Sequence, residues 1–204
     1  MPMFRLKLTP ALAAVLWLAQ PAPSISQTVG SADAPAMTVL VRHADRPAGF
    51  DPPLNPAGMK RAEDLAAALH DTKFSAIIAT DFIRTGDTAG PTASALGIVA
   101  ETVPRKNRPR DQPQLHVNEV EAAVRKHAGE VVLVVNHSDT LPAIIAALGG
   151  PRIVPICDSI YDDLFMLVPT MGKMQFVHSR YGAPTPPGPE CATMQSGPAV
   201  SSQS

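Results

Sequence analysis

Residues 38–46 have the sequence TVLVRHADR, in which a short apolar run ends abruptly in charged residues. Branched aliphatic side chains in such a run are typical of a buried β-strand. Residues 131–140, VVLVVNHSDT, have the same form and also end in a histidine, His137. Buried strands of this kind indicate a parallel sheet, in which functional side chains gather beyond the carboxyl ends of the strands.

Similar apolar runs alternate with segments of helical periodicity along the chain, which predicts an α/β fold. Strands are expected at residues 38–41, 75–80, 98–101, 131–135, 164–168 and 175–178, and helices at 56–69, 81–97, 115–127 and 141–148. Asn55 is the expected N-cap of the first helix, whose apolar face would include Met59, and Pro91 is expected to interrupt the second. We predict three layers, with a central, mostly parallel sheet and helices on both faces, over residues 37–182.

The composition is that of one folded domain with no electrostatic attraction to nucleic acid. The length of 204 residues and the balance of 45% hydrophobic to 17% charged residues fit a single globular unit. Lys and Arg number 17 against 18 Asp and Glu, and no basic block occurs. A nucleic-acid partner is therefore not expected.

Both ends of the chain differ in composition from the predicted domain. An apolar run at residues 11–19 follows two basic residues, which predicts a signal peptide at 1–26 with cleavage after Ser26 or Ser24, and a leader at 27–36. The mature protein would be periplasmic or secreted, with no membrane span after processing; an uncleaved anchor is the alternative. Residues 183–204 lack periodicity and are expected to be disordered, unless Cys191 ties them down. Cys157 and Cys191 would pair in an oxidising compartment, or else remain free thiols.

The polar clusters at the strand ends combine arginines with histidines. Arg42, His43 and Arg46 follow the first strand, Arg84 follows the second, and His137 follows the strand at 131–135. Arginines would repel a metal dication but suit a phosphoryl group, and a neutral imidazole can attack phosphorus. The set predicts phosphoryl transfer.

Four segments then resemble the histidine phosphatase superfamily, which has the phosphoglycerate-mutase-like fold, and in particular its exported bacterial members. They are Val41-Arg42-His43-Ala44-Asp45-Arg46, Leu54-Asn55-Pro56-Ala57-Gly58, Arg84-Thr85-Gly86-Asp87-Thr88-Ala89 and Val134-Val135-Asn136-His137-Ser138-Asp139-Thr140. The resemblance implies hydrolysis of phosphomonoesters without a metal or other cofactor. It implies that His43 is the phosphorylated nucleophile and that Arg42, Arg84 and His137 form the phosphate pocket.

The chain departs from the family pattern at several positions. Ala44 stands where Gly is usual, and Asn136 and Asp139 replace the Gly and Asn of the common GHSNT segment. The insertion that carries the acidic residue of the mutases is not recognisable, so mutase activity is not expected. Asp45 is the first choice for the general acid, followed by Asp139 and Asp111.

Arg46, Asn55 and Ser138 are the expected substrate-binding residues, and the substrate would be a phosphorylated small molecule or envelope component. The other histidines, His116 among them, are interpreted as surface or helix-end residues. Two alternatives stay open. In the first alternative, the chain is an exported anion-binding pseudoenzyme of the same fold. In the second, it is a metal-binding protein that uses His43, His137, Asp45 and Asp139.

Overall fold

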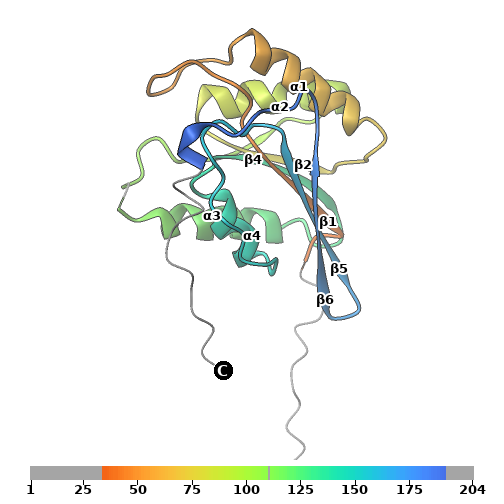
Figure 1. Cartoon of the computed structure of the whole chain (residues 1–204). Helices are drawn as coiled ribbons and strands as arrows, with labels where there is room; N and C mark the ends of the chain where they lie inside the picture. Colours follow the sequence, from red (N-terminus) through yellow and green to blue (C-terminus); the bar gives the residue numbers. More distant parts are fainter. Residues whose placement is uncertain (1–33, 110, 192–204) are drawn as a thin grey trace, which may run out of the picture.

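A six-stranded sheet forms the centre of the protein. The computed structural model describes residues 34–109 and 111–191. Its strands, in the order β3-β2-β4-β1-β5-β6, are β1 (Met37–Arg42), β2 (Ala76–Thr80), β3 (Glu101–Val103), β4 (Val131–Asn136), β5 (Asp163–Thr170) and β6 (Lys173–Arg180) (Figure 1). The first four strands run parallel, whereas β5 pairs antiparallel with β1 and with β6. The predicted mostly parallel sheet is confirmed, with an antiparallel hairpin added at one edge.

The β5–β6 hairpin closes through a turn of the two residues Met171 and Gly172. Both have positive φ, 36° and 81°, which is the backbone of the primed turns that match the twist of antiparallel strands. Glycine takes such a conformation without a steric penalty, which explains why the chain reverses there.

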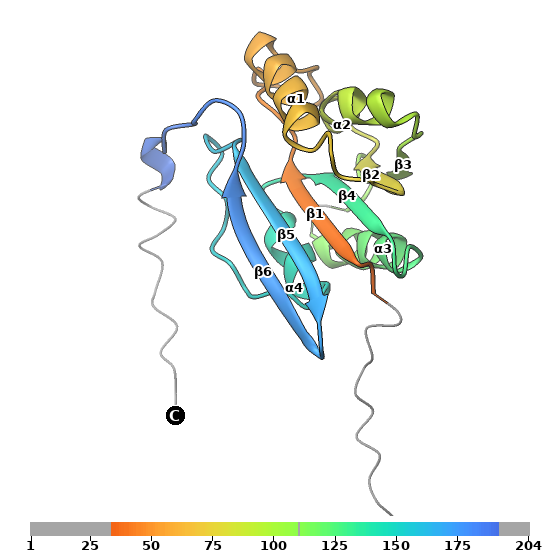
Figure 2. The same cartoon turned by 90° about the vertical axis from the view of Figure 1, so that its right-hand side faces the viewer.

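Two pairs of helices cover opposite faces of the sheet, as predicted (Figure 2). The helices are α1 (Pro56–Ala68), α2 (Ile83–Leu96), α3 (Pro113–Arg125) and α4 (Leu141–Ala147). Leu65 of α1 and Ala89 of α2 pack on the strand residues Val39 and Val41. The other face of the strands packs against the apolar sides of α3 and α4. The strands β1, β2 and β4 therefore bury both of their faces, which explains their continuous apolar runs in the sequence.

The start of α1 follows its predicted signals. The Asn55 side chain accepts a 2.8 Å hydrogen bond from the Gly58 amide, and Pro56 opens the helix. The loop after β1 passes so close that a Cβ on Gly58 would lie 2.0 Å from the Asp45 carbonyl oxygen, so only glycine fits there. Met59, expected on the apolar face, is instead 60% exposed.

The structure differs from the prediction at two places, within α2 and directly after it. The helix continues through Pro91 to Leu96 without interruption and ends at Gly97, whose φ is 65°. The Ile98 amide still bonds back to the Ala93 carbonyl, in the manner of a Schellman motif. This bond uses the amide that a strand would need, and β3 begins only at Glu101.

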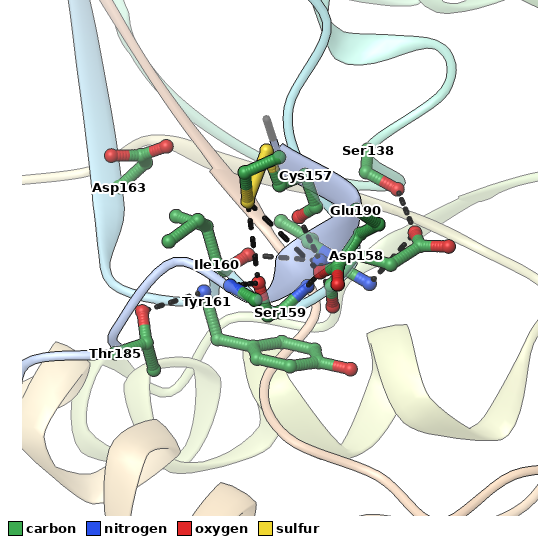
Figure 3. Close-up of a disulfide and its surroundings, with 12 residues drawn as sticks. Ser138, Cys157, Asp158, Ser159, Ile160, Tyr161, Asp163, Thr185 and Glu190 are labelled. Atoms are coloured by element: carbon green, nitrogen blue, oxygen red, sulfur yellow. Dashed lines mark hydrogen bonds and ion pairs between the residues drawn. A yellow bond between two sulfur atoms is a disulfide. The ribbon is translucent and has the colours of Figure 1, made fainter. Parts of the chain in front are cut away.

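The chain after β6 packs against the domain. Cys191 forms the predicted disulfide with Cys157 (Figure 3). Thr185 hydrogen-bonds to Asp162, and the Gly188 amide hydrogen-bonds to the Ser159 hydroxyl. For residues 183–191 the stated exception to disorder applies, because Cys191 ties this part of the tail to the domain. The disulfide and these polar contacts replace the apolar contacts that the sequence there lacks.

The signal peptide predicted at 1–26, most of the leader and the last part of the tail lie outside the described residues. Within residues 34–109 and 111–191, no helix has the length and apolar character needed to cross a membrane.

Candidate active site

The two strand-end histidines meet because their strands are neighbours in register. Arg42, the last residue of β1, pairs with Asn136, the last residue of β4. The amide of His43 then donates a 2.8 Å hydrogen bond to the Asn136 carbonyl, and the rings of His43 and His137 lie 5.3 Å apart. The helix after β1 covers one face of the sheet and the helix after β4 covers the other. Such a divergence opens a crevice at the carboxyl ends of the strands.

A cavity of about 430 Å³ occupies this crevice. Six of the predicted site residues line it, namely Arg42, His43, Arg46, Arg84, His137 and Ser138. Its volume falls within the range of about 300–1,000 Å³ that is usual for small-molecule sites. The arginines and histidines expected from the sequence thus lie around one space.

His43 is held as a neutral imidazole with a defined tautomer. Its Nδ1 lies 2.9 Å from the Ala44 carbonyl oxygen, which can only accept, so Nδ1 carries the proton and Nε2 keeps its lone pair. Burial lowers the pKa of His43 to about 3, together with smaller effects of Arg42, Arg84 and Arg46 and against the opposing effect of that hydrogen bond. The ring is 2% exposed. The ring is therefore neutral at neutral pH, which is the form that a nucleophilic imidazole needs.

His137 is fixed by partners on both ring nitrogens. Arg84 Nη2 lies 3.3 Å from Nδ1, and because a guanidinium can only donate, Nδ1 must accept. The proton then sits on Nε2, which lies 3.1 Å from the Thr80 hydroxyl, and that hydroxyl lies 2.8 Å from the hydroxyl of Thr85. Burial lowers the pKa of His137 well below its usual value, and His43 and Arg84 add to the effect. His137 is therefore neutral in this arrangement and orients Arg84.

Arg84 lies at the start of α2 and is 8% exposed. Its guanidinium lies 4.1 Å from the Phe82 ring and also contacts the Phe50 carbonyl and Asp51. Burial lowers its pKa to about 10, with a further contribution from Arg46. The Arg84 Nε is buried and has no hydrogen-bond partner among the described residues, which leaves a donor for an anion in the cavity.

Arg42 is positioned by the loop before β5. Its Nη1 donates to the carbonyl oxygens of Cys157, Asp158 and Ile160 at 2.8–2.9 Å. The guanidinium lies 4.0 Å from the Tyr161 ring, and burial lowers its pKa. Within the described part of the chain its Nε also has no partner. The loop carbonyls engage Nη1, and Asp158 lies 3.5 Å from Nη2, so Nε is the donor of this guanidinium that remains without a partner among the described residues.

The structure does not bring two predicted residues to the cavity. Asp45, the first choice for the general acid, turns away and forms a 2.6 Å ion pair with Arg61 of α1, which is 4% exposed. Asn55, expected to bind substrate, uses its side chain to cap α1. Neither residue lines the cavity, so both expectations are corrected.

The carboxylates that do line the cavity are those of Asp139 and Asp158. Asp139, an alternative acid, pairs with Arg105 at 2.6 Å, and Asp158 accepts a bond from Ser138 at 3.2 Å. Asp111, the remaining alternative, does not line the cavity. Asp158 was missed because it lies in a loop with no periodicity, more than a hundred residues from Arg42 in the sequence.

The four residues of the metal-binding alternative do not form one cluster in the described part of the chain. Asp45 points away from His43 and His137, and Asp139 is engaged by an arginine. Among the described residues, no group of three or more His, Cys, Asp or Glu side chains is placed to hold a metal ion.

His116 is a second residue that the sequence interpretation missed. It was expected at the surface or at a helix end; it lies near the start of α3, yet it is 1% exposed and lines the cavity. Its spacing of four residues from Val120, on the buried side of α3, was the available signal. The ring lies 3.2 Å from the side-chain amide nitrogen of Asn136, whose Oδ1 accepts bonds from the His137 amide and the Thr140 hydroxyl. His116 thus satisfies the Asn136 that replaces the usual glycine.

Comparisons with known proteins agree with this architecture. The family model described as histidine phosphatase superfamily (branch 1) matches residues 38–107, which include His43 and Arg84. No curated protein matches the chain by sequence.

Similar solved structures include the protein histidine phosphatase SixA complexed with tungstate, with 15% identity over 71% of this chain and 96% of that one, at a TM-score of 0.54. The alpha-ribazole phosphatase from Shigella flexneri has 15% identity over 69% and 94%, at 0.52. YhfR from Bacillus stearothermophilus has 20% identity over 70% and 95%, at 0.51. At these identities the likeness establishes the shared fold.

Proposed function

Because this chain belongs to the histidine phosphatase superfamily, we propose that it hydrolyses phosphomonoesters through a phosphohistidine intermediate on His43. The observation that carries the proposal is the tautomer of His43. The bond from Nδ1 to the Ala44 carbonyl leaves the lone pair on Nε2, in a cavity that also contains unpartnered arginine donors. A nucleophile and the groups that stabilise charge on the transferring phosphoryl group are both present.

The reaction would proceed in two steps. In the first, Nε2 of His43 forms a bond to phosphorus as the ester oxygen leaves with a proton from an acid. The Ala44 carbonyl stabilises the positive charge that then develops on the ring, because its oxygen accepts a hydrogen bond from the protonated Nδ1. In the second step, water gives a proton back to the acid as it attacks phosphorus, the bond to Nε2 breaks with the electron pair returning to that nitrogen, and inorganic phosphate is released.

The arginines supply the electrostatic part of catalysis. Arg42 and Arg84 approach from different elements, and each has a buried Nε available to the phosphoryl oxygens. Fixed donors in a buried site stabilise the transition state without having to reorganise. His137 keeps Arg84 in place through its Nδ1. Asp139 and Asp158 are the carboxylates available to protonate the leaving oxygen.

We also propose that turnover needs no metal ion and that the protein works outside the cytoplasm on a phosphorylated small molecule or envelope component. Support for the first point comes from the arginine-rich cavity, which disfavours a dication. Support for the second comes from the apolar N-terminal run and the disulfide.

The test is release of phosphate from p-nitrophenyl phosphate by the mature protein, with and without EDTA. The wild type should turn over equally in both, and His43→Ala should be inactive. Arg84→Ala should lose about a hundredfold in kcat/KM, because one such donor contributes about 3 kcal/mol. Arg125→Gln, an exposed change on α3, is the matched control. A wild type that binds phosphate without turnover would instead indicate the anion-binding pseudoenzyme.

A further inference from the structure

The cavity contains more cationic side chains than one phosphoryl group requires. Beyond Arg42 and Arg84, four further cations line it, which we call the outer cations: Arg46, Arg105, Lys106 and Arg108. A phosphomonoester carries a charge of about −1.5 to −2 at neutral pH, which the inner arginines can already balance. The outer cations therefore call for an explanation of their own.

Arg46 is the outer cation with the least compensation. Among the described residues, the hydrogen bonds of its guanidinium go to backbone, the carbonyl oxygens of Pro47 and Gly49 at 3.0 and 3.4 Å. Its Nε is buried, with neither a hydrogen-bond partner nor a carboxylate ion pair in residues 34–109 and 111–191. An unpartnered cationic donor on a cavity wall is a place where an anion would bind.

The other outer cations have carboxylate partners, most of them open to solvent. Arg105 pairs with Asp139, whose side chain is 65% exposed, and Arg108 pairs with the partly exposed Glu119. Ion pairs of this kind contribute little, so an anion that enters the cavity can replace the carboxylate. Lys106 differs, because its partner Asp51 is largely buried and also contacts Arg84.

The outer cations are close enough to act on the inner site. Arg46 contributes to the lowered pKa of His43 and Arg84, and Arg105 contributes to the lowered pKa of His137 and His116. The space between the two sets is one continuous cavity of about 430 Å³, which is large enough for a leaving group as well as the phosphoryl group.

We propose that the preferred substrate carries a second anionic group on its leaving group, a phosphate or a carboxylate, which binds at Arg46 and Arg105 while the scissile phosphoryl group lies at His43. This inference rests on the proposed phosphatase function and specifies its substrate class. The second group stays intact during the reaction and holds the ester oxygen in place.

The experiment compares substrates that differ only in the second group. The probes are the bisphosphates of α,ω-alkanediols of increasing chain length, the corresponding ω-hydroxyalkyl phosphates and the ω-carboxyalkyl phosphates. We expect the best bisphosphate or carboxyalkyl phosphate to exceed its hydroxyl counterpart by about tenfold in kcat/KM per phosphoryl group, equivalent to about 1.4 kcal/mol. The two anionic series distinguish a phosphate from a carboxylate as the second group.

Substitutions identify the residues responsible. Arg46→Gln and Arg105→Gln should reduce that ratio towards one, whatever their effect on the absolute rates, and Arg125→Gln should preserve it. Equal kcat/KM for charged and uncharged leaving groups in the wild type, with turnover of both, would overturn this inference and leave the phosphatase assignment standing. A ratio that both variants retain would also overturn it. Hydrolysis of none of the probes would overturn the phosphatase assignment itself.

Discussion

Arg42 donates a 2.9 Å hydrogen bond to the carbonyl oxygen of Cys157, a residue that is itself joined to Cys191 by a disulfide. The loop that follows Cys157 provides two more carbonyl oxygens to the same guanidinium nitrogen. Figure 3 shows this loop between the disulfide and Ser138, which lies on the cavity. The cross-link and the arginine that we propose binds phosphate are therefore parts of one structure.

Reduction of the disulfide should lower both stability and phosphate binding. A cross-link across 34 residues contributes about 2–4 kcal/mol in the chain-entropy model. Without it, the loop carbonyls hold Arg42 less firmly, and KM should rise at temperatures where the protein remains folded. Turnover with and without dithiothreitol measures this, and the Cys157→Ser/Cys191→Ser double variant, which should not respond to reductant, is the control. An unchanged KM after verified reduction would contradict the coupling.

Thr80 should prove to be a positioning residue for His137. Thr80→Val leaves the Nε2 proton of His137 unpaired in a buried site, a cost of about 1–3 kcal/mol, so kcat should fall by about tenfold. Thr80→Ser keeps the hydroxyl and should restore most of the rate. Nitrogen chemical shifts of His137 report the tautomer directly. A Thr80→Val protein with the wild-type tautomer and rate would disprove the role.

Asp45→Asn should lower the free energy of unfolding. It should leave the pH profile of kcat unchanged, whereas loss of the general acid would alter that profile. Arg61 is buried and would lose its carboxylate partner, which costs about 3 kcal/mol in such pairs. Urea denaturation measures the loss. Asp64→Asn, which removes the partly exposed i,i+4 partner of the exposed Lys60, should have little effect. Loss of the acid-dependent limb of kcat in Asp45→Asn alone would return Asp45 to the catalytic site.

The free energy of unfolding should fall as the pH is lowered from about 6.5 towards 3. The pKa of His43 is about 3 in the folded protein and near 6.5 in the unfolded chain, so the unfolded state binds more protons in this window. Each histidine of this kind contributes up to about 1.4 kcal/mol per pH unit. His43→Gln should flatten the dependence. Equal slopes for the two proteins would show that His43 is not buried in its neutral form.

The sequence predicted those features that depend on local patterns. Apolar runs located β1 and β4, the Asn55–Pro56 signal located the start of α1, and the strand ends located His43 and His137. The sequence did not predict contacts between side chains and partners that lie far away along the chain. Nothing near Asp45 indicates that Arg61 of the next helix binds it, and nothing near Asp158 indicates that its loop reaches Arg42.

The most direct test of the central claim is a rapid-quench experiment with a phosphate-labelled substrate. The account predicts that wild-type protein traps a phosphoprotein that is acid-labile and base-stable, as expected for phosphohistidine, with the label on His43. His43→Ala should show no label, while its arginines still bind inorganic phosphate. Full turnover in His43→Ala, or a wild type that turns over without ever forming a labelled protein, would contradict the mechanism.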